Sequence, residues 1–175
     1  KSAEFILQPG VTPVVFIEPH GASFAAVMER LNQDPKLCVV ECTSMMDAVS
    51  VIRPMDACLI ITHAKTEKDV NQHISMLKIL SAQVQRKKIR TLVTTNLRSD
   101  EVLGKLTYQG CSEIVPDTIT ARALMFKIDR HLKILPRPGM AGASGAAQSG
   151  ANGKKNEAGG KSRNPNGSAA EQAAA

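Results

Sequence analysis

Polar side chains that could carry chemistry follow the apolar runs that we predict to be strands. In a parallel sheet the carboxyl ends of the strands share one edge, and ligands bind beyond it. The residues predicted there are Glu18, Pro19, His20, Thr62, His63, Thr95, Asn96 and Asp117. Two histidines with Glu18 between them could hold a metal ion, but their spacing matches no metal motif. We therefore predict no metal and no cofactor.

The possible ligand cleft consists of His20, His63 and Asn96. A pocket for a small ligand, such as a nucleotide, a metal ion or an anion, is one interpretation of these residues. The simpler interpretation is that both histidines belong to loops and face water. The sequence contains neither of the glycine-rich patterns that hold nucleotide phosphates.

The cysteines and methionines are expected to fill the core. Cys38 and Cys42 lie four residues apart, hence on one face of a strand, and Cys58 and Cys111 adjoin other strand cores. The sequence has no Cys-x-x-Cys pair, and a buried thiol behaves as a small apolar group. Five methionines also fall on predicted apolar faces, namely Met28, Met45, Met46, Met76 and Met125.

Basic residues cluster at the end of the longest predicted helix, as Arg86, Lys87, Lys88 and Arg90. Cations there stabilise the negative end of the helix dipole, which explains the cluster without a ligand. Modules that bind nucleic acids usually add stacking aromatic side chains, yet aromatic residues make up only 3% of the chain. A DNA-associated regulator is therefore our weakest hypothesis.

Apolar runs alternate with helical patterns five times along the chain. Continuous runs predict buried strands at 14–17, 37–40, 57–61, 92–93 and 114–115, and helical spacing predicts helices at 22–31, 45–52, 70–84, 102–106 and 124–132. Strands that are apolar on both faces form parallel sheets covered by helices on both sides. With right-handed crossovers between the strands, the result is a doubly wound α/β fold. We predict an α/β fold, a three-layer sandwich around five parallel strands.

The 175 residues suit one folded domain. No apolar stretch approaches the roughly 20 residues of a membrane-spanning helix, and the first residues lack a signal-peptide pattern, so we predict a cytoplasmic protein. We place an N-terminal extension at 1–12, the folded domain at 13–138 and a disordered linker or tail at 139–175. That tail is rich in Gly, Ala, Ser and Asn, a composition typical of flexible connections within larger proteins.

The five β-α units resemble the receiver domain of bacterial response regulators, whose flavodoxin-like sheet has the strand order 2-1-3-4-5. The last third of the domain matches best. The segment Ile-Arg-Thr-Leu-Val-Thr-Thr at 89–95 resembles the fourth receiver strand, which ends in a switch Ser or Thr. The segment Gly-Cys-Ser-Glu-Ile-Val at 110–115 resembles the entry to the fifth strand. The resemblance implies this fold over about residues 13–135.

The residues that give receivers their phosphotransfer chemistry are mostly absent. Receivers hold a divalent cation with two acids after the first strand, where this chain has Glu18 and Pro19. Their phosphoacceptor Asp closes the third strand, where this chain reads Ile-Thr-His at 61–63, and their Lys after the fifth strand falls on Asp117. Only the switch hydroxyl, at Thr95, is kept. Because an aspartyl phosphate needs a carboxylate nucleophile, the resemblance implies a pseudoreceiver that is no enzyme.

In receivers, the fourth helix, fifth strand and fifth helix form a face for dimerisation and output. The resemblance places exposed candidates for this face at Arg98, Glu101, Lys105, Tyr108, Arg122, Lys127, Arg130 and Lys133. Exposed tyrosine is favoured as an interface anchor, although half-buried packing of Tyr108 and a plain solvated face are equal alternatives. Our leading hypothesis is a signalling module of the two-component type that binds a partner protein or forms a homodimer. A small-ligand sensor that uses the cleft is the alternative.

Overall fold

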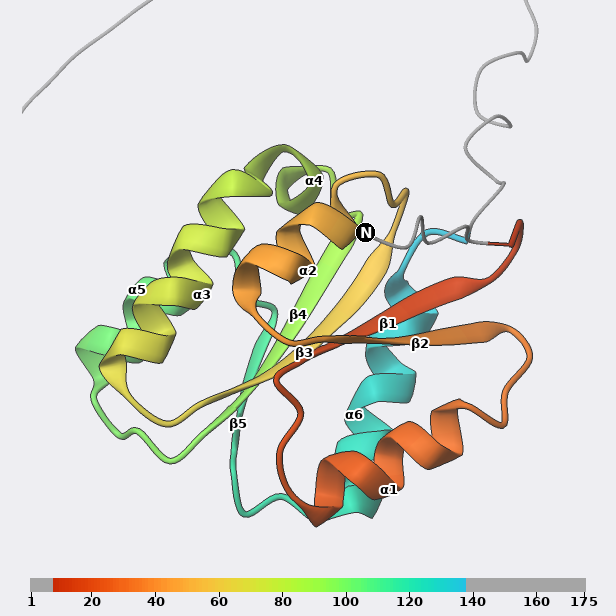
Figure 1. Ribbon diagram of the computed structural model, residues 1–175. Coiled ribbons are helices and arrows are strands. Elements are labelled where there is room, and N and C mark those ends of the chain that lie inside the picture. Colours follow the sequence, from red (N-terminus) through yellow and green to blue (C-terminus); the bar gives the residue numbers. More distant parts are fainter. Residues whose placement is uncertain (1–7, 138–175) are drawn as a thin grey trace, which may run out of the picture. The chain divides into compact units, whose positions relative to one another are not determined.

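Five parallel strands form the centre of the computed structural model, which describes residues 8–137 (Figure 1). They are β1 (Thr12–Ile17), β2 (Leu37–Cys42), β3 (Cys58–Ala64), β4 (Ile89–Thr95) and β5 (Glu113–Pro116). Their order is β2-β1-β3-β4-β5, and every neighbouring pair is parallel. This order confirms the predicted flavodoxin-like sheet. The predicted tail and most of the predicted N-terminal extension lie outside the described residues.

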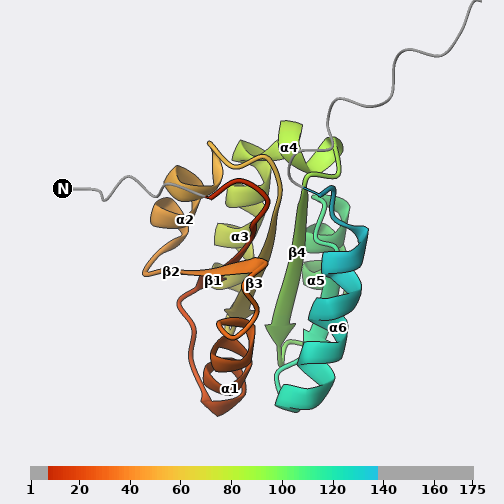
Figure 2. The ribbon, with the colours of Figure 1, turned by 90° about the vertical axis from the view of Figure 1, so that its right-hand side faces the viewer.

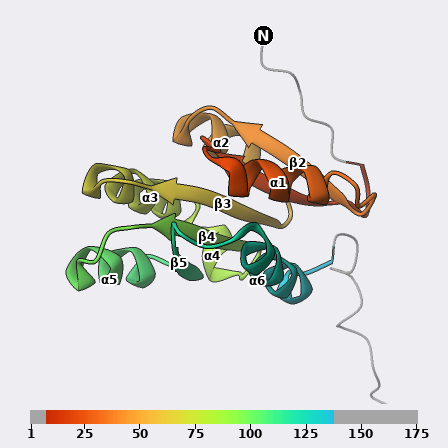
Figure 3. The same cartoon turned by 90° about the horizontal axis from the view of Figure 1, so that it is seen from below.

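Helices cover both faces of the sheet and give the fold three layers (Figures 2 and 3). One layer contains α1 (Ala22–Leu31) and α6 (Ala121–Ile134). The other contains α2 (Met45–Ile52), α3 (Glu67–Ile79), α4 (Ser81–Gln85) and α5 (Asp100–Tyr108). Among residues 8–137, no helix is long and apolar enough to cross a membrane.

The central strands are buried on both faces, because successive residues of a strand point to opposite sides. In β1, Val14 and Phe16 pack with α1 and α6, whereas Val15 and Ile17 pack with the four helices of the other layer. Neighbouring β3 alternates in the same way. The continuous apolar runs of the sequence therefore mark strands that are covered on both sides.

The four cysteines are free thiols and belong to the core, as predicted. Cys42, Cys58 and Cys111 are buried between the sheet and the four-helix layer, and Cys38 packs at the edge of the same cluster. Burial raises the pKa of the Cys58 and Cys111 thiols to about 12. Because the thiolate is the reactive form of cysteine, neither thiol is suited to nucleophilic chemistry.

The single helix predicted over 70–84 is wrong, because the chain breaks between α3 and α4 at Leu80. Gln83, in α4, supplies a physical reason. Its side-chain amide donates to the backbone carbonyl oxygens of Arg53 at 3.2 Å and Met55 at 3.3 Å. These bonds hold the short helix against the chain that leaves α2, in place of a straight continuation of α3.

The prediction that Met46 fills the core is also wrong, since 69% of this residue is exposed. The buried stripe of α2 runs through Ala48, Val49 and Ile52, and Met46 lies off that stripe. Three of the other methionines are buried as predicted, namely Met28, Met76 and Met125, and Met45 packs at the edge of the core.

Candidate functional site

A hollow of about 420 Å³ opens where β3 and β4 end, beside the start of α1. Its polar lining consists of His20, Ser23, His63, Lys65, Thr94 and Asp117. Three of the predicted site residues, His20, His63 and Asp117, therefore surround one cavity. The cavity lies at the carboxyl edge of the sheet, where ligands of such folds bind.

His63 and Thr94 form a polar pair in this hollow. They are register partners in β3 and β4, and Nδ1 of His63 lies 2.9 Å from the Thr94 hydroxyl oxygen. The Thr94 hydroxyl also donates to the backbone carbonyl of Thr62 over 3.4 Å. When the Thr94 hydroxyl donates to Thr62, its oxygen accepts from Nδ1 of His63, and the tautomer that makes this bond has an unprotonated Nε2.

Thr95, the predicted switch residue, does not line the hollow of His63. It is buried, its hydroxyl donates to the carbonyl oxygen of Ala64 at 2.7 Å, and it accepts from the backbone amide of Leu97 at 3.1 Å. Both bonds fix the chain that leaves β4. The hydroxyl in the cavity belongs to Thr94, which our sequence analysis missed because strand register decides which of two adjacent threonines faces a given side.

Thr62, also predicted for the site, is buried and bonded to α3 rather than facing the hollow. Its hydroxyl lies 2.7 Å from Nε2 of His73, and Nδ1 of His73 lies 2.6 Å from the backbone carbonyl oxygen of Asp69. A carbonyl oxygen only accepts, so Nδ1 carries the proton and Nε2 accepts from Thr62. Burial lowers the pKa of His73, which favours this neutral ring. His73 therefore joins α3 to β3.

Glu18 lies apart from the two histidines. It is exposed after β1 with a left-handed backbone (φ 46°) and lines a separate hollow of about 460 Å³ between α2 and α3. Pro19 and Asn96 line two further hollows, and that of Asn96 also includes Asp117. Within residues 8–137, no group of three His, Cys, Asp or Glu side chains could hold a metal ion.

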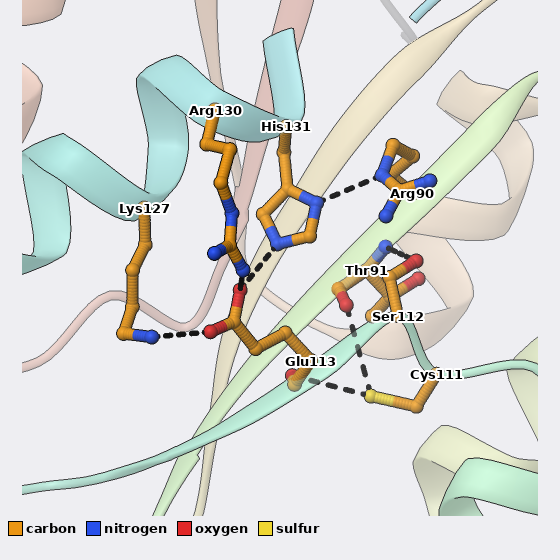
Figure 4. A network of polar contacts seen from close by, with 8 residues as sticks. All are labelled: Arg90, Thr91, Cys111, Ser112, Glu113, Lys127, Arg130 and His131. Carbon is orange, nitrogen blue, oxygen red and sulfur yellow. Dashed lines mark hydrogen bonds and ion pairs between the residues drawn. The ribbon is translucent and has the colours of Figure 1, made fainter. Parts of the chain in front are cut away.

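A charged network that the sequence analysis did not predict joins β5 to α6 (Figure 4). The Glu113 side chain is 15% exposed and pairs with Lys127, with Arg130 at 3.2 Å and with His131 at 2.6 Å. Burial raises the pKa of Glu113, but hydrogen bonds from Lys127 and His131 outweigh it and hold the pKa below its usual range. Lys127, which we predicted to be exposed, is half-buried by this contact.

Arg90 determines which ring nitrogen of the neutral His131 carries the proton. Its Nε donates to Nδ1 of His131 over 2.8 Å, and a guanidinium nitrogen never accepts, so the proton of the neutral ring sits on Nε2 and is donated to Glu113. Burial lowers the pKa of His131, and the charge of Arg90 lowers it further, against the opposing pull of Glu113. Arg90, part of the predicted basic cluster, is thus engaged inside the fold (Figure 4).

The remaining predicted surface residues lie on what we call the α5–β5–α6 face. Those exposed on it are Arg98, Glu101, Lys105, Tyr108, Arg122, Arg130 and Lys133. Tyr108 is 92% exposed, which excludes half-buried packing. Phe126 and Ile134 of α6 are also exposed, by 72% and 57%. Sequence analysis missed these two, although both fall outside the apolar stripe of the helix.

Comparisons with known proteins bear on the fold. No family model and no curated protein matches the sequence. A response regulator from Thermotoga maritima has a TM-score of 0.51 at 10% identity, over 70% of this chain and 99% of that chain. The signal receiver domain of NarL, assigned as a response regulator, from Mycobacterium tuberculosis has a TM-score of 0.51 at 14% identity, over 71% and 98%. CpaE from Burkholderia thailandensis, assigned to pilus assembly, has a TM-score of 0.52 at 15% identity, over 70% and 98%.

At these identities the similarity shows the fold alone. The chain covers nearly the whole length of each of the three structures, and the strand order β2-β1-β3-β4-β5 is the one expected from the resemblance. This chain therefore has the five-stranded α/β fold of receiver domains.

Proposed function

We propose that this chain is a pseudoreceiver, a signalling module that takes no phosphoryl group and acts by binding protein. The observation that carries the proposal is His63. This side chain stands at the end of β3, hydrogen-bonded to Thr94 at 2.9 Å, where the resemblance requires a carboxylate. An imidazole cannot form the aspartyl phosphate on which receiver chemistry depends.

The other groups of that chemistry are dispersed or have the wrong charge. Phosphoryl transfer needs a metal ion held by acids and positive charge around the transferred group. Glu18 lines a different hollow from His63. Asp117 brings a negative charge to the hollow of His63, and Lys65 is its one lysine or arginine among the described lining residues. These charges disfavour a bound phosphoryl group.

The α5–β5–α6 face supports the protein-binding half of the proposal. Tyr108 is almost fully exposed at the end of α5, and a tyrosine offers a large contact area for little loss of side-chain entropy. Glu101 and Lys105 provide both signs of charge on the same helix, which suits either a partner protein or pairing between two copies. We propose that this face docks within a larger cytoplasmic regulatory protein.

Phosphorylation is tested on the whole chain, by NMR and by transfer from labelled acetyl phosphate. We expect no incorporated phosphate, and no amide shifts at the strand ends when Mg²⁺ and beryllofluoride are added. Shifts centred on Glu18, Thr62, Thr95 and Asp117 would show a pocket that still takes a phosphoryl mimic. Either that result or labelling that depends on Glu18 would overturn the proposal.

Protein binding is tested by a photo-crosslinking amino acid in place of Tyr108. The matched control carries the same group in place of Met46, which is 69% exposed on α2, outside the α5–β5–α6 face. We expect a defined cross-linked product from position 108 and none from position 46. Equal products from both positions, or none from either, would argue against docking through this face.

A small-ligand sensor is the second candidate, favoured by the hollow of about 420 Å³ around His20, His63 and Asp117. In the tautomer protonated on Nδ1, Nε2 of His63 would accept a hydrogen bond from an amino or hydroxyl group of a nucleotide. A saturable change in the NMR signals of these residues on adding a nucleotide or an anion would support it. Loss of the response in His63→Ala, with the fold intact, would place the ligand in this hollow.

A further inference from the structure

The outer side of α6 carries alternating basic and apolar side chains, which we call the α6 stripe. It consists of Arg122, Phe126, Arg130 and Ile134, spaced four residues apart and therefore along one side of the helix. All four are exposed. The opposite side of α6 packs against α1 and the sheet (Figure 3). The core thus gives no reason for an aromatic ring in the middle of this stripe.

The charge around the stripe is mainly positive. Arg122 and Lys133 have no ion-pair partner among residues 8–137, and Asp129 is the single acid in the sequence of α6. Arg130 is held by Glu113 at 3.2 Å while 58% of its side chain stays exposed. It is therefore already positioned beside Phe126. Aromatic and arginine side chains are the types that contribute most to protein interfaces.

We propose that the α6 stripe binds an acidic segment of a partner protein, whose apolar side chains cover Phe126 and Ile134. A segment in which acidic and apolar residues alternate complements the stripe in both charge and polarity. This inference rests on the proposed function, because it specifies the chemistry of the partner that docks on the α5–β5–α6 face. It also makes Phe126 the central anchor of that contact.

An anionic lipid surface fits the stripe less well. Side chains that enter a membrane lie on the side of a helix that faces the acyl chains, with cations at the flanks. Here Arg130 lies between Phe126 and Ile134 along the helix and is tied to Glu113. Insertion of both apolar side chains would carry this guanidinium toward the hydrocarbon, which is costly.

A second copy of the chain is also a poorer occupant. It would have to present acids to the basic stripe, and the acids of α5 on the same face are Asp100 and Glu101. Glu101 is already paired with Lys105 at 2.6 Å. The homodimer is therefore an outcome for the experiment to detect rather than the expected one.

The test measures binding of the full chain to two fluorescent helical peptides of equal length. One presents Glu and Leu in alternation at four-residue spacing, and the other has Lys in place of Glu. We expect saturable binding of the Glu peptide alone, weakened about tenfold or more by Phe126→Ser. Met46→Ser removes a similarly exposed apolar side chain from α2 and should leave the affinity unchanged. Arg122→Glu should weaken binding most at low salt.

The outcomes separate the possible occupants. Failure of the Glu peptide to bind, equal binding of both peptides, or equal effects of Phe126→Ser and Met46→Ser would overturn the inference. Preferential binding to phosphatidylserine vesicles that is lost in Phe126→Ser would assign the stripe to lipid instead. A concentration-dependent dimer abolished by the same substitution would assign it to a second copy. The proposed function fails separately, if the cross-links from position 108 are absent.

Discussion

Replacing Glu113 with Gln tests how strongly the charged network of Figure 4 holds β5 against α6. The substitution keeps the size of the side chain and removes the charge that Lys127, Arg130 and His131 share. Every partner loses an ion pair or a charge-assisted hydrogen bond, and none is itself altered. The difference in unfolding free energy therefore reports what the carboxylate contributes.

The expected magnitude follows from the exposure of the partners. The Lys127 and Arg130 side chains are 31% and 58% exposed and can turn toward water, so we expect about 0.5 kcal/mol from each. His131 is 2% exposed and exchanges a charged acceptor for a neutral amide, which costs about 1 kcal/mol. The sum is about 2 kcal/mol, or a fall in Tm of roughly 6–10 °C for a domain of this size.

Urea unfolding followed by circular dichroism at pH 7.5 measures this difference. Glu101→Gln is the matched control, because Glu101 pairs only with Lys105 among the described residues and 78% of its side chain is exposed. We expect the control to change the unfolding free energy much less than Glu113→Gln does, because an exposed ion pair contributes little. If Glu113→Gln costs no more than Glu101→Gln, the network adds no stability and apolar packing alone holds α6.

Three further predictions concern pH and local structure. Burial lowers the pKa of His73 and His131 in the folded protein. The stability gained from their neutral rings is therefore complete above their pKa in the unfolded chain, about 6.5, and is lost as the pH falls toward their lowered pKa in the folded chain. Urea midpoints that stay constant from pH 7.5 to 5 would contradict this prediction. Gly110→Ala should lower the free energy of unfolding by about 2–4 kcal/mol, because φ is 113° and the new Cβ would lie 2.6 Å from Cγ1 of Val84. An unchanged Tm in thermal unfolding would refute the steric argument. Thr66→Ala removes the capping box that starts α3. We expect the free energy of unfolding to fall by about 1 kcal/mol and the amide hydrogens of the first turn to exchange faster. Unchanged exchange in that turn would show that the cap is dispensable.

The layers and strand order were predictable because the core repeats one simple pattern. The strands β1 and β3 at the centre of the sheet contain continuous apolar runs, and an amphipathic helix follows each strand. Few topologies are compatible with parallel strands joined by helical crossovers. The resemblance to receiver domains indicated which of these strand orders to expect. The break at Leu80 was not predictable, because it depends on bonds from Gln83 to carbonyl groups 28 and 30 residues away.

The candidate site was less predictable, since its geometry depends on which side chain faces which neighbour. Thr94 and Thr95 are adjacent and chemically identical, and only pairing with β3 shows that Thr94 meets His63. The network of Glu113 joins residues 14 to 18 positions apart, and Arg90 adds a bond across 41 positions. No local spacing signals such contacts. Phe126 did carry a signal, because it falls off the apolar stripe of its own helix.

The bonding of the buried hydroxyls also bears on regulation. A switch residue must exchange one set of contacts for another when a ligand binds, because a ligand shifts an equilibrium only through a difference in its interactions with two states. The Thr95 hydroxyl already donates to Ala64 and accepts from Leu97, and the Thr62 hydroxyl donates to His73. Moving either one would leave a buried polar group unpaired, at a cost of about 1–3 kcal/mol. If the chain takes no phosphoryl group, as we propose, nothing offsets that cost. The proposed docking through the α5–β5–α6 face would then be constitutive, because the face would hold one conformation.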